Sequence, residues 1–132
     1  MLRSRLVKPR DLLMQLSAGR VAIGAVLIAK PPLVTSGWVG RAGNKPAGRV
    51  LARGLGARDA ALGALTLAAL RSGQPVRPLV LAGLLCDGTD LLATHAVRHN
   101  LPSAAAPLIY ALAGGALLVG AANLTDSEAP QA

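Results

Sequence analysis

Five charged residues stand inside apolar segments, where an unpaired charge is costly. Asp87 and Asp90 occur one helical turn apart in GLLCDGTDLLATH, Arg58 and Asp59 are adjacent in GLGARDAALGAL, and Arg20 occurs in AGRVAIGAV. Carboxylates and guanidinium groups placed in this way can pair with one another, hold a proton or bind a polar ligand. We therefore interpret these five residues as a candidate charge-paired centre.

The positions of the five residues also predict how they pair. Each lies within about two helical turns of the middle of its segment, so antiparallel packing would bring all of them to one level. Arg58 and Asp59 project about 100° apart on a helix, so we expect Arg58 to pair with Asp87 or Asp90, and Asp59 to pair with Arg20. One of the three carboxylates is then left to be protonated, hydrated or paired elsewhere. The pairs either fix the register of the helices or form a centre that binds a proton or a polar ligand.

The segments that carry these charges have the composition of membrane helices. The chain has 132 residues, of which 52% are hydrophobic and 15% charged, against roughly 25% charged residues in soluble domains. We predict an all-α fold, a single integral membrane bundle of four transmembrane helices, each with about the 20 residues that a bilayer core requires. The predicted spans are Leu12–Ala29, Ala47–Leu70, Leu79–Val97 and Ser103–Ala122.

The connections between the spans indicate their order in space. RSGQPVRP and RHNLP are short turns, so the helices that they join should be antiparallel neighbours. PPLVTSGWVGRAGNKP is longer, and its prolines and glycines exclude a long helix, so we expect an interfacial loop with Trp38 at the headgroup level. Residues 1–11 form a short basic segment, and residues 124–132 are predicted to be a disordered acidic tail.

Basic residues bracket the apolar segments, as in membrane proteins that meet anionic headgroups. They are not interleaved with aromatic residues, so a nucleic-acid partner is not expected. We predict a multi-pass protein of a bacterial inner membrane with both termini in the cytoplasm. A cleaved signal peptide is an alternative for the first segment, although no small-x-small site follows VAIGAVLIAK. A soluble all-helical protein with a buried core is a third alternative, although segments this long with so few surface charges would leave it insoluble.

Other reactive side chains lack the context that chemistry requires. His95 and His99 have the spacing of metal ligands on a helix, but no third ligand follows from the sequence, so no metal and no cofactor are predicted. Cys86 is the only cysteine and cannot form an intrachain disulfide. No serine stands in a G-x-S-x-G motif, and the chain is therefore not expected to be an enzyme.

Small residues recur at helical spacing in two segments and indicate close helix packing. The first seam consists of Gly56, Ala60 and Gly63, and the second of Gly115, Ala116 and Gly120. At LGARDAALG and DGTDLLAT the sequence resembles small four-helix bacterial membrane proteins of uncharacterised function, near the DoxX-like families. The resemblance covers roughly residues 50–97. It implies a four-helix membrane bundle and brings no activity and no functional residues.

Two functions are open at this point. The first is a non-enzymatic accessory or scaffold subunit that packs in the lipid bilayer against a larger membrane complex or against itself. The alternative is a small carrier or redox-linked protein whose central cluster of arginines and aspartates binds a proton or a polar ligand.

Overall fold

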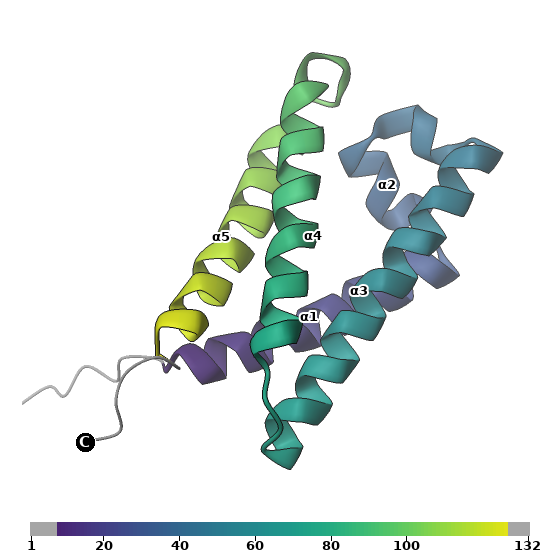
Figure 1. Ribbon diagram of the computed structural model, residues 1–132. Helices are drawn as coiled ribbons and strands as arrows, with labels where there is room; N and C mark the ends of the chain where they lie inside the picture. Colours follow the sequence, from purple (N-terminus) through teal and green to yellow (C-terminus); the bar gives the residue numbers. More distant parts are fainter. Residues whose placement is uncertain (1–7, 127–132) are drawn as a thin grey trace, which may run out of the picture.

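The computed structural model describes residues 8–126, and this part of the chain is helical without strands (Figure 1). Four long helices are joined by turns, one of which contains a short helix. Their bounds are α1 Pro9–Ala29, α2 Pro32–Trp38, α3 Pro46–Ser72, α4 Arg77–Ala96 and α5 Ala105–Asp126, with 3-10 turns η1 Gly40–Asn44 and η2 Arg98–Asn100.

Prolines and one glycine set the helix boundaries. Pro9, Pro32 and Pro46 are the first residues of α1, α2 and α3, where the missing N–H costs nothing and the fixed φ suits the helix. Gly73 ends α3 with φ +69°, a left-handed conformation that glycine adopts without a steric penalty. The predicted interfacial loop therefore contains the short helix α2, which begins at Pro32, includes Gly37 and ends before Gly40 and Gly43.

Helices α1 and α3 are antiparallel and form the most extensive helix pair, and α4 and α5 form the second (Figure 1). The guanidinium group of Arg10 donates to the carbonyl of Leu70 near the first end of α1. At the other end, Arg53 Nε donates to the carbonyl of Ile28 at 3.1 Å. The two helices therefore stay in register along their length.

The first seam of small residues allows this close approach. A Cβ atom on Gly24 would lie 2.5 Å from the carbonyl oxygen of Gly56 and 2.6 Å from the backbone nitrogen of Ala60. One on Gly63 would lie 2.5 Å from the carbonyl oxygen of Ser17. In the second seam, Gly120 packs against Leu84 whereas Gly115 has open space beside it, so only part of that seam makes a close contact.

The two ends of the described chain lie at the same end of the molecule. Asn123 Nδ2 on α5 donates to the carbonyl of Pro9 at 2.9 Å. The buried residues Leu13, Leu70 and Val80 pack together and join α1, α3 and α4. Helices α3 and α4 diverge from the turn that joins them, and α2 lies between their far ends (Figure 1).

Three helices of the described chain, α1, α4 and α5, are long and apolar enough to cross a membrane. The prediction of four such spans is wrong for α3, which carries several charged side chains. They are Arg49, Arg53, Arg58, Asp59 and Arg71. Gly56 and Gly63 of α3 face α1, whereas Val50, Leu51 and Leu65 on the same helix are exposed.

The ends of the chain differ partly from the prediction. Residues 124–126 continue α5 as a helix, although we expected the disordered tail to begin there. The rest of that tail, and most of the basic segment at the start of the chain, lie outside the described residues.

Candidate functional site

The five charged residues singled out in the sequence form one connected network. Arg20 on α1 contacts Asp87 on α4 through Nη2 and approaches Asp59 Oδ1 on α3 at 3.5 Å through Nη1. Arg58 Nη2 lies 2.9 Å from the same Asp59 oxygen and 2.7 Å from Asp90 Oδ2. Negative and positive groups therefore alternate from Asp87 to Asp90, and the network links α4 to α1, to α3 and back to α4.

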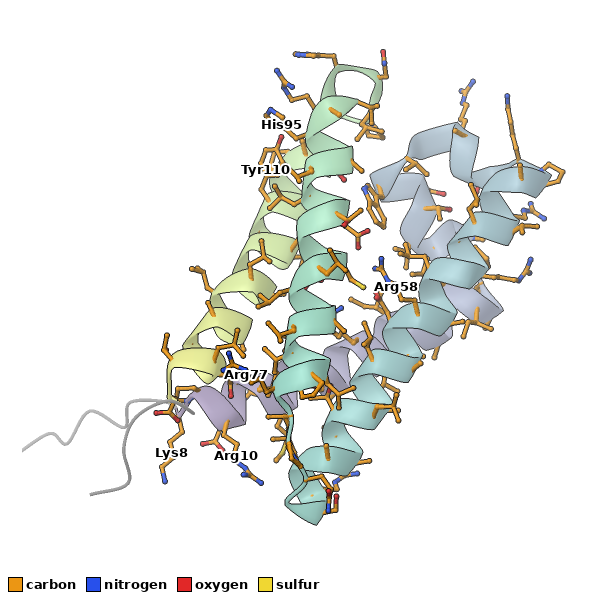
Figure 2. All side chains as sticks on the ribbon, in the orientation of Figure 1. Lys8, Arg10, Arg58, Arg77, His95 and Tyr110 are labelled. Atoms are coloured by element: carbon orange, nitrogen blue, oxygen red, sulfur yellow. The ribbon has the colours of Figure 1, made fainter. Side chains whose placement is uncertain are left out.

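Two of these contacts were expected, and two were not. Arg58 reaches Asp90, with a second contact of 3.2 Å from Nη1 to Oδ1, and Asp59 is near Arg20. Asp87 instead pairs with Arg20, and Arg58 also folds back onto Asp59. Helix geometry gives the direction of each Cβ but not the position of the end of a long side chain. Arg58 points from α3 toward α4 (Figure 2), and its guanidinium group also reaches Asp59 on its own helix.

The network has three carboxylates but only two arginines, and none of the three carboxylates is left without a guanidinium neighbour. Asp59 Oδ1 accepts hydrogen bonds from both Nε and Nη2 of Arg58, at 3.1 and 2.9 Å, and also lies near Arg20. Asp87 and Asp90 each contact one arginine. All three carboxylates thus have a guanidinium neighbour, although the formal charges of the five residues add to one negative charge.

Exposure increases from one end of the network to the other. The side chains of Arg20 and Asp87 are 11% and 10% exposed, whereas those of Arg58 and Asp90 are 28% and 22% exposed. Asp87 is therefore enclosed among α1, α3 and α4, and Asp90 is the carboxylate that a ligand reaches more readily.

A cavity of about 340 Å³ borders the network. Arg20, Asp59, Asp87 and Asp90 line one part of it. The remaining walls are mainly apolar and come chiefly from α1 and α5. They include Ile23, Leu27, Leu108, Ile109 and Leu112. Small-molecule sites are typically apolar cavities of about 300–1,000 Å³ with a few convergent polar groups, and this cavity has that character.

Trp38 connects this cavity to a second one and was not predicted to be part of the site. The second cavity, of about 490 Å³, lies among α2, η1 and α3, and it shares Trp38, Leu55 and Asp90 with the first. Trp38 Nε1 donates to Thr94 Oγ1 on α4 at 3.1 Å. One feature of the sequence could have indicated a partner at this position. Thr94 falls on the same face of its helix as Asp87, and its hydroxyl needs a hydrogen-bond partner when it is buried.

The histidine pair does not have the geometry of a metal site on a helix. Helix α4 ends at Ala96, so His99 belongs to η2. His95 Nδ1 lies 2.6 Å from the hydroxyl of Tyr110 on α5, and the two side chains meet at the far end of these helices (Figure 2). Over residues 8–126, no three histidine, cysteine or acidic side chains are arranged to hold a metal ion.

Comparisons with models of protein families, with curated proteins and with solved structures found no match. The resemblance to the DoxX-like families therefore stays a prediction.

Proposed function

We propose that this chain is an integral membrane protein that binds a small, mostly apolar ligand with a cationic head. The head lies against Asp90, and the apolar part occupies the cavity between α1 and α5. The observation that carries the proposal is the composition of that cavity, which combines three carboxylates and one guanidinium group with apolar walls.

The charges that line the cavity favour a cation. Asp59, Asp87 and Asp90 face it together with Arg20, whereas Arg58 is not among its lining residues. Electrostatic interactions are stronger beside apolar walls than in bulk water. A positively charged group would therefore be stabilised there, and an anionic one would be repelled. The proposed function corresponds to the alternative that we predicted from the sequence, a small carrier with a central charged cluster, and it specifies the ligand as an amphiphilic cation.

Asp90 is the residue that best suits contact with the ligand head. It is more exposed than Asp87, and it borders both cavities. Its two oxygens contact Arg58 at 2.7 and 3.2 Å, so a bound cation would share this carboxylate with a guanidinium group. Asp87 and Arg20, which are more enclosed, would hold the helices in place around the cavity.

The hypothesis of an accessory or scaffold subunit stays a prediction. Leu85, Leu92 and Leu118 are exposed on α4 and α5, as expected for helix faces that contact either lipid or a partner helix. Their exposure therefore favours neither function.

The proposal is tested by what the full chain retains when purified from membranes in a mild detergent. Small molecules extracted from the protein are identified by mass spectrometry for the wild type, Asp90→Asn and Asp126→Asn. Asp126 is exposed and belongs to neither cavity, so its variant is the matched control. We expect an ammonium-bearing molecule with the wild type and the control, and its loss from Asp90→Asn.

Two outcomes would contradict the proposal. Equal recovery of the same molecule from all three proteins would show that Asp90 does not hold it. Co-purification of larger subunits in fixed proportion, with no bound small molecule, would favour the accessory subunit instead.

A further inference from the structure

A second candidate site lies away from the charged network, where α1 passes into α2. A pocket of about 350 Å³ is lined there by three cationic residues, Lys30, Arg49 and Arg53. Pro31 and Pro32 form another part of its wall, and proline fixes the local backbone. The pocket shares no lining residue with the two cavities that border Asp90.

Within residues 8–126, no carboxylate compensates these cations. The sequence has no acidic residue between Asp11 and Asp59. Among the described residues, neither Lys30, Arg49 nor Arg53 forms an ion pair, although Arg53 Nε donates to the carbonyl of Ile28. The pocket therefore has a net positive charge that an anion would neutralise.

The position of Arg49 makes a bound anion more favourable. Arg49 is in the first turn of α3, where the positive end of the helix dipole disfavours a cation and favours an anion. Arg53 follows one turn later on the same side of the helix. An anion in the pocket would be stabilised by both arginines and would relieve the unfavourable position of Arg49.

The surroundings of the pocket indicate an amphiphilic anion. Lys30 directly follows α1, one of the helices that can cross a membrane, so the pocket lies at the expected level of the lipid headgroups. Leu33 also lines the pocket and is 72% exposed. A phosphate group on the cations would thus leave an acyl chain beside an exposed apolar side chain.

We propose that this pocket binds the headgroup phosphate of an anionic phospholipid. Cations at a membrane surface attract anionic lipids, and the three that line this pocket come from two parts of the chain, the end of α1 and the start of α3. The proposal does not depend on the ligand of the central cavity, because the two sites have separate lining residues.

The test uses the full chain in detergent and counts bound phospholipids by native mass spectrometry. Phosphatidylglycerol is titrated against the wild type, Lys30→Gln, Arg49→Gln and the double variant. Arg41→Gln is the matched control, since Arg41 is an exposed cation in η1 that does not line the pocket. Arg53 is left unchanged because it also bonds α1. An unchanged helical circular dichroism signal shows that each variant is folded.

We expect each pocket variant to weaken phosphatidylglycerol binding about fivefold and the double variant about 25-fold. Arg41→Gln should change binding less than roughly twofold. Phosphatidylcholine, which has no net charge, should bind more weakly than phosphatidylglycerol. Inorganic phosphate in excess should leave phosphatidylglycerol bound, because it offers no acyl chain to the surface beside Leu33.

Three results would overturn the proposal. If Arg41→Gln weakens binding as much as the pocket variants, the attraction comes from the overall charge of this end of the molecule. If phosphatidylcholine binds equally well, the pocket does not recognise the charge of the headgroup. If inorganic phosphate displaces phosphatidylglycerol at similar concentration, the ligand is free phosphate and not a lipid.

Discussion

Asp90 differs from the other two aspartates of the network in its contacts. Both of its oxygens face Arg58, at 3.2 and 2.7 Å, and it borders both cavities. A carboxylate that meets a guanidinium group through two contacts has a well-defined orientation. Asp90 can therefore present a fixed negative charge to the cavity, whereas Asp87 is enclosed with Arg20.

The contacts of Arg58 predict which aspartate it is coupled to. In a double-mutant cycle on stability in detergent, Arg58→Met and Asp90→Leu should show a coupling free energy of about 1–3 kcal/mol. The parallel cycle with Asp87→Leu should show weaker coupling, because Arg58 does not contact Asp87 and is connected to it only through Asp59 and Arg20. Stronger coupling of Arg58 to Asp87 than to Asp90 would show that the pairs are arranged differently.

Arg20 is expected to be the most important of the five residues for stability. Arg20→Met would leave the enclosed Asp87 without its arginine, and removal of one partner from a buried pair costs about 3–5 kcal/mol. Adding Asp87→Leu should recover part of that loss, since it removes the uncompensated charge. The control Arg41→Met, at an exposed position, should stay within about 0.5 kcal/mol. A similarly small effect of Arg20→Met would exclude this role.

At the scale of the elements, the contact between α1 and α3 depends on which glycines face it. A Cβ atom on Gly56 would lie 2.7 Å from the carbonyl oxygen of Gly24, whereas one on Gly54 would meet nothing within 4 Å. Both glycines are on α3, so they form a matched pair of positions. The same substitution should therefore have opposite effects at the two sites.

Gly56→Ala should destabilise the protein by about 1–3 kcal/mol, because backbone atoms of α1 must move to admit the methyl group. Gly54→Ala should stabilise it by up to about 1 kcal/mol, since alanine favours a helix more than glycine does. Thermal unfolding in detergent measures both. If Gly56→Ala is as stable as Gly54→Ala, the helices do not pack as closely as the structure indicates.

Much of the architecture could be predicted from the sequence, because apolar segments, prolines and turn residues act locally. The four long helices lie close to the predicted segments, and the five charged residues meet at one level. The membrane prediction failed at α3, since its apolar residues alternate with charges and its small residues face α1. The Arg20–Asp87 pair and the role of Trp38 could not be derived, because spacing gives the face of a helix but not which neighbour a long side chain reaches.

At the scale of the whole molecule, the hydrogen bond from Asn123 to the carbonyl of Pro9 holds the two ends of the described chain together, so we predict both termini on the same side of the membrane. This prediction requires α3, which is not apolar enough to be a candidate span by itself, to cross packed against α1. Reporter fusions at each terminus and in the turn at Gly73 should report one side, and a reporter inserted in η1 should report the other. Placement of the termini in the cytoplasm stays a prediction from the basic residues near the start of the chain. Termini on opposite sides would mean that α3 does not cross the membrane with α1.

The central claim, a cavity that binds an amphiphilic cation, is tested most directly by the fluorescence of Trp38. It is the only tryptophan in the sequence and lines the cavity together with Asp90. Octylammonium and octanol have the same alkyl chain, but only octylammonium has a charged head. Each is titrated against the wild type, Asp90→Asn and Asp126→Asn. We predict a saturable change in Trp38 fluorescence when octylammonium is added to the wild type or to Asp126→Asn. The affinity for octylammonium should be about tenfold or more weaker in Asp90→Asn. Equal responses to octanol and octylammonium, unaffected by Asp90→Asn, would contradict the claim.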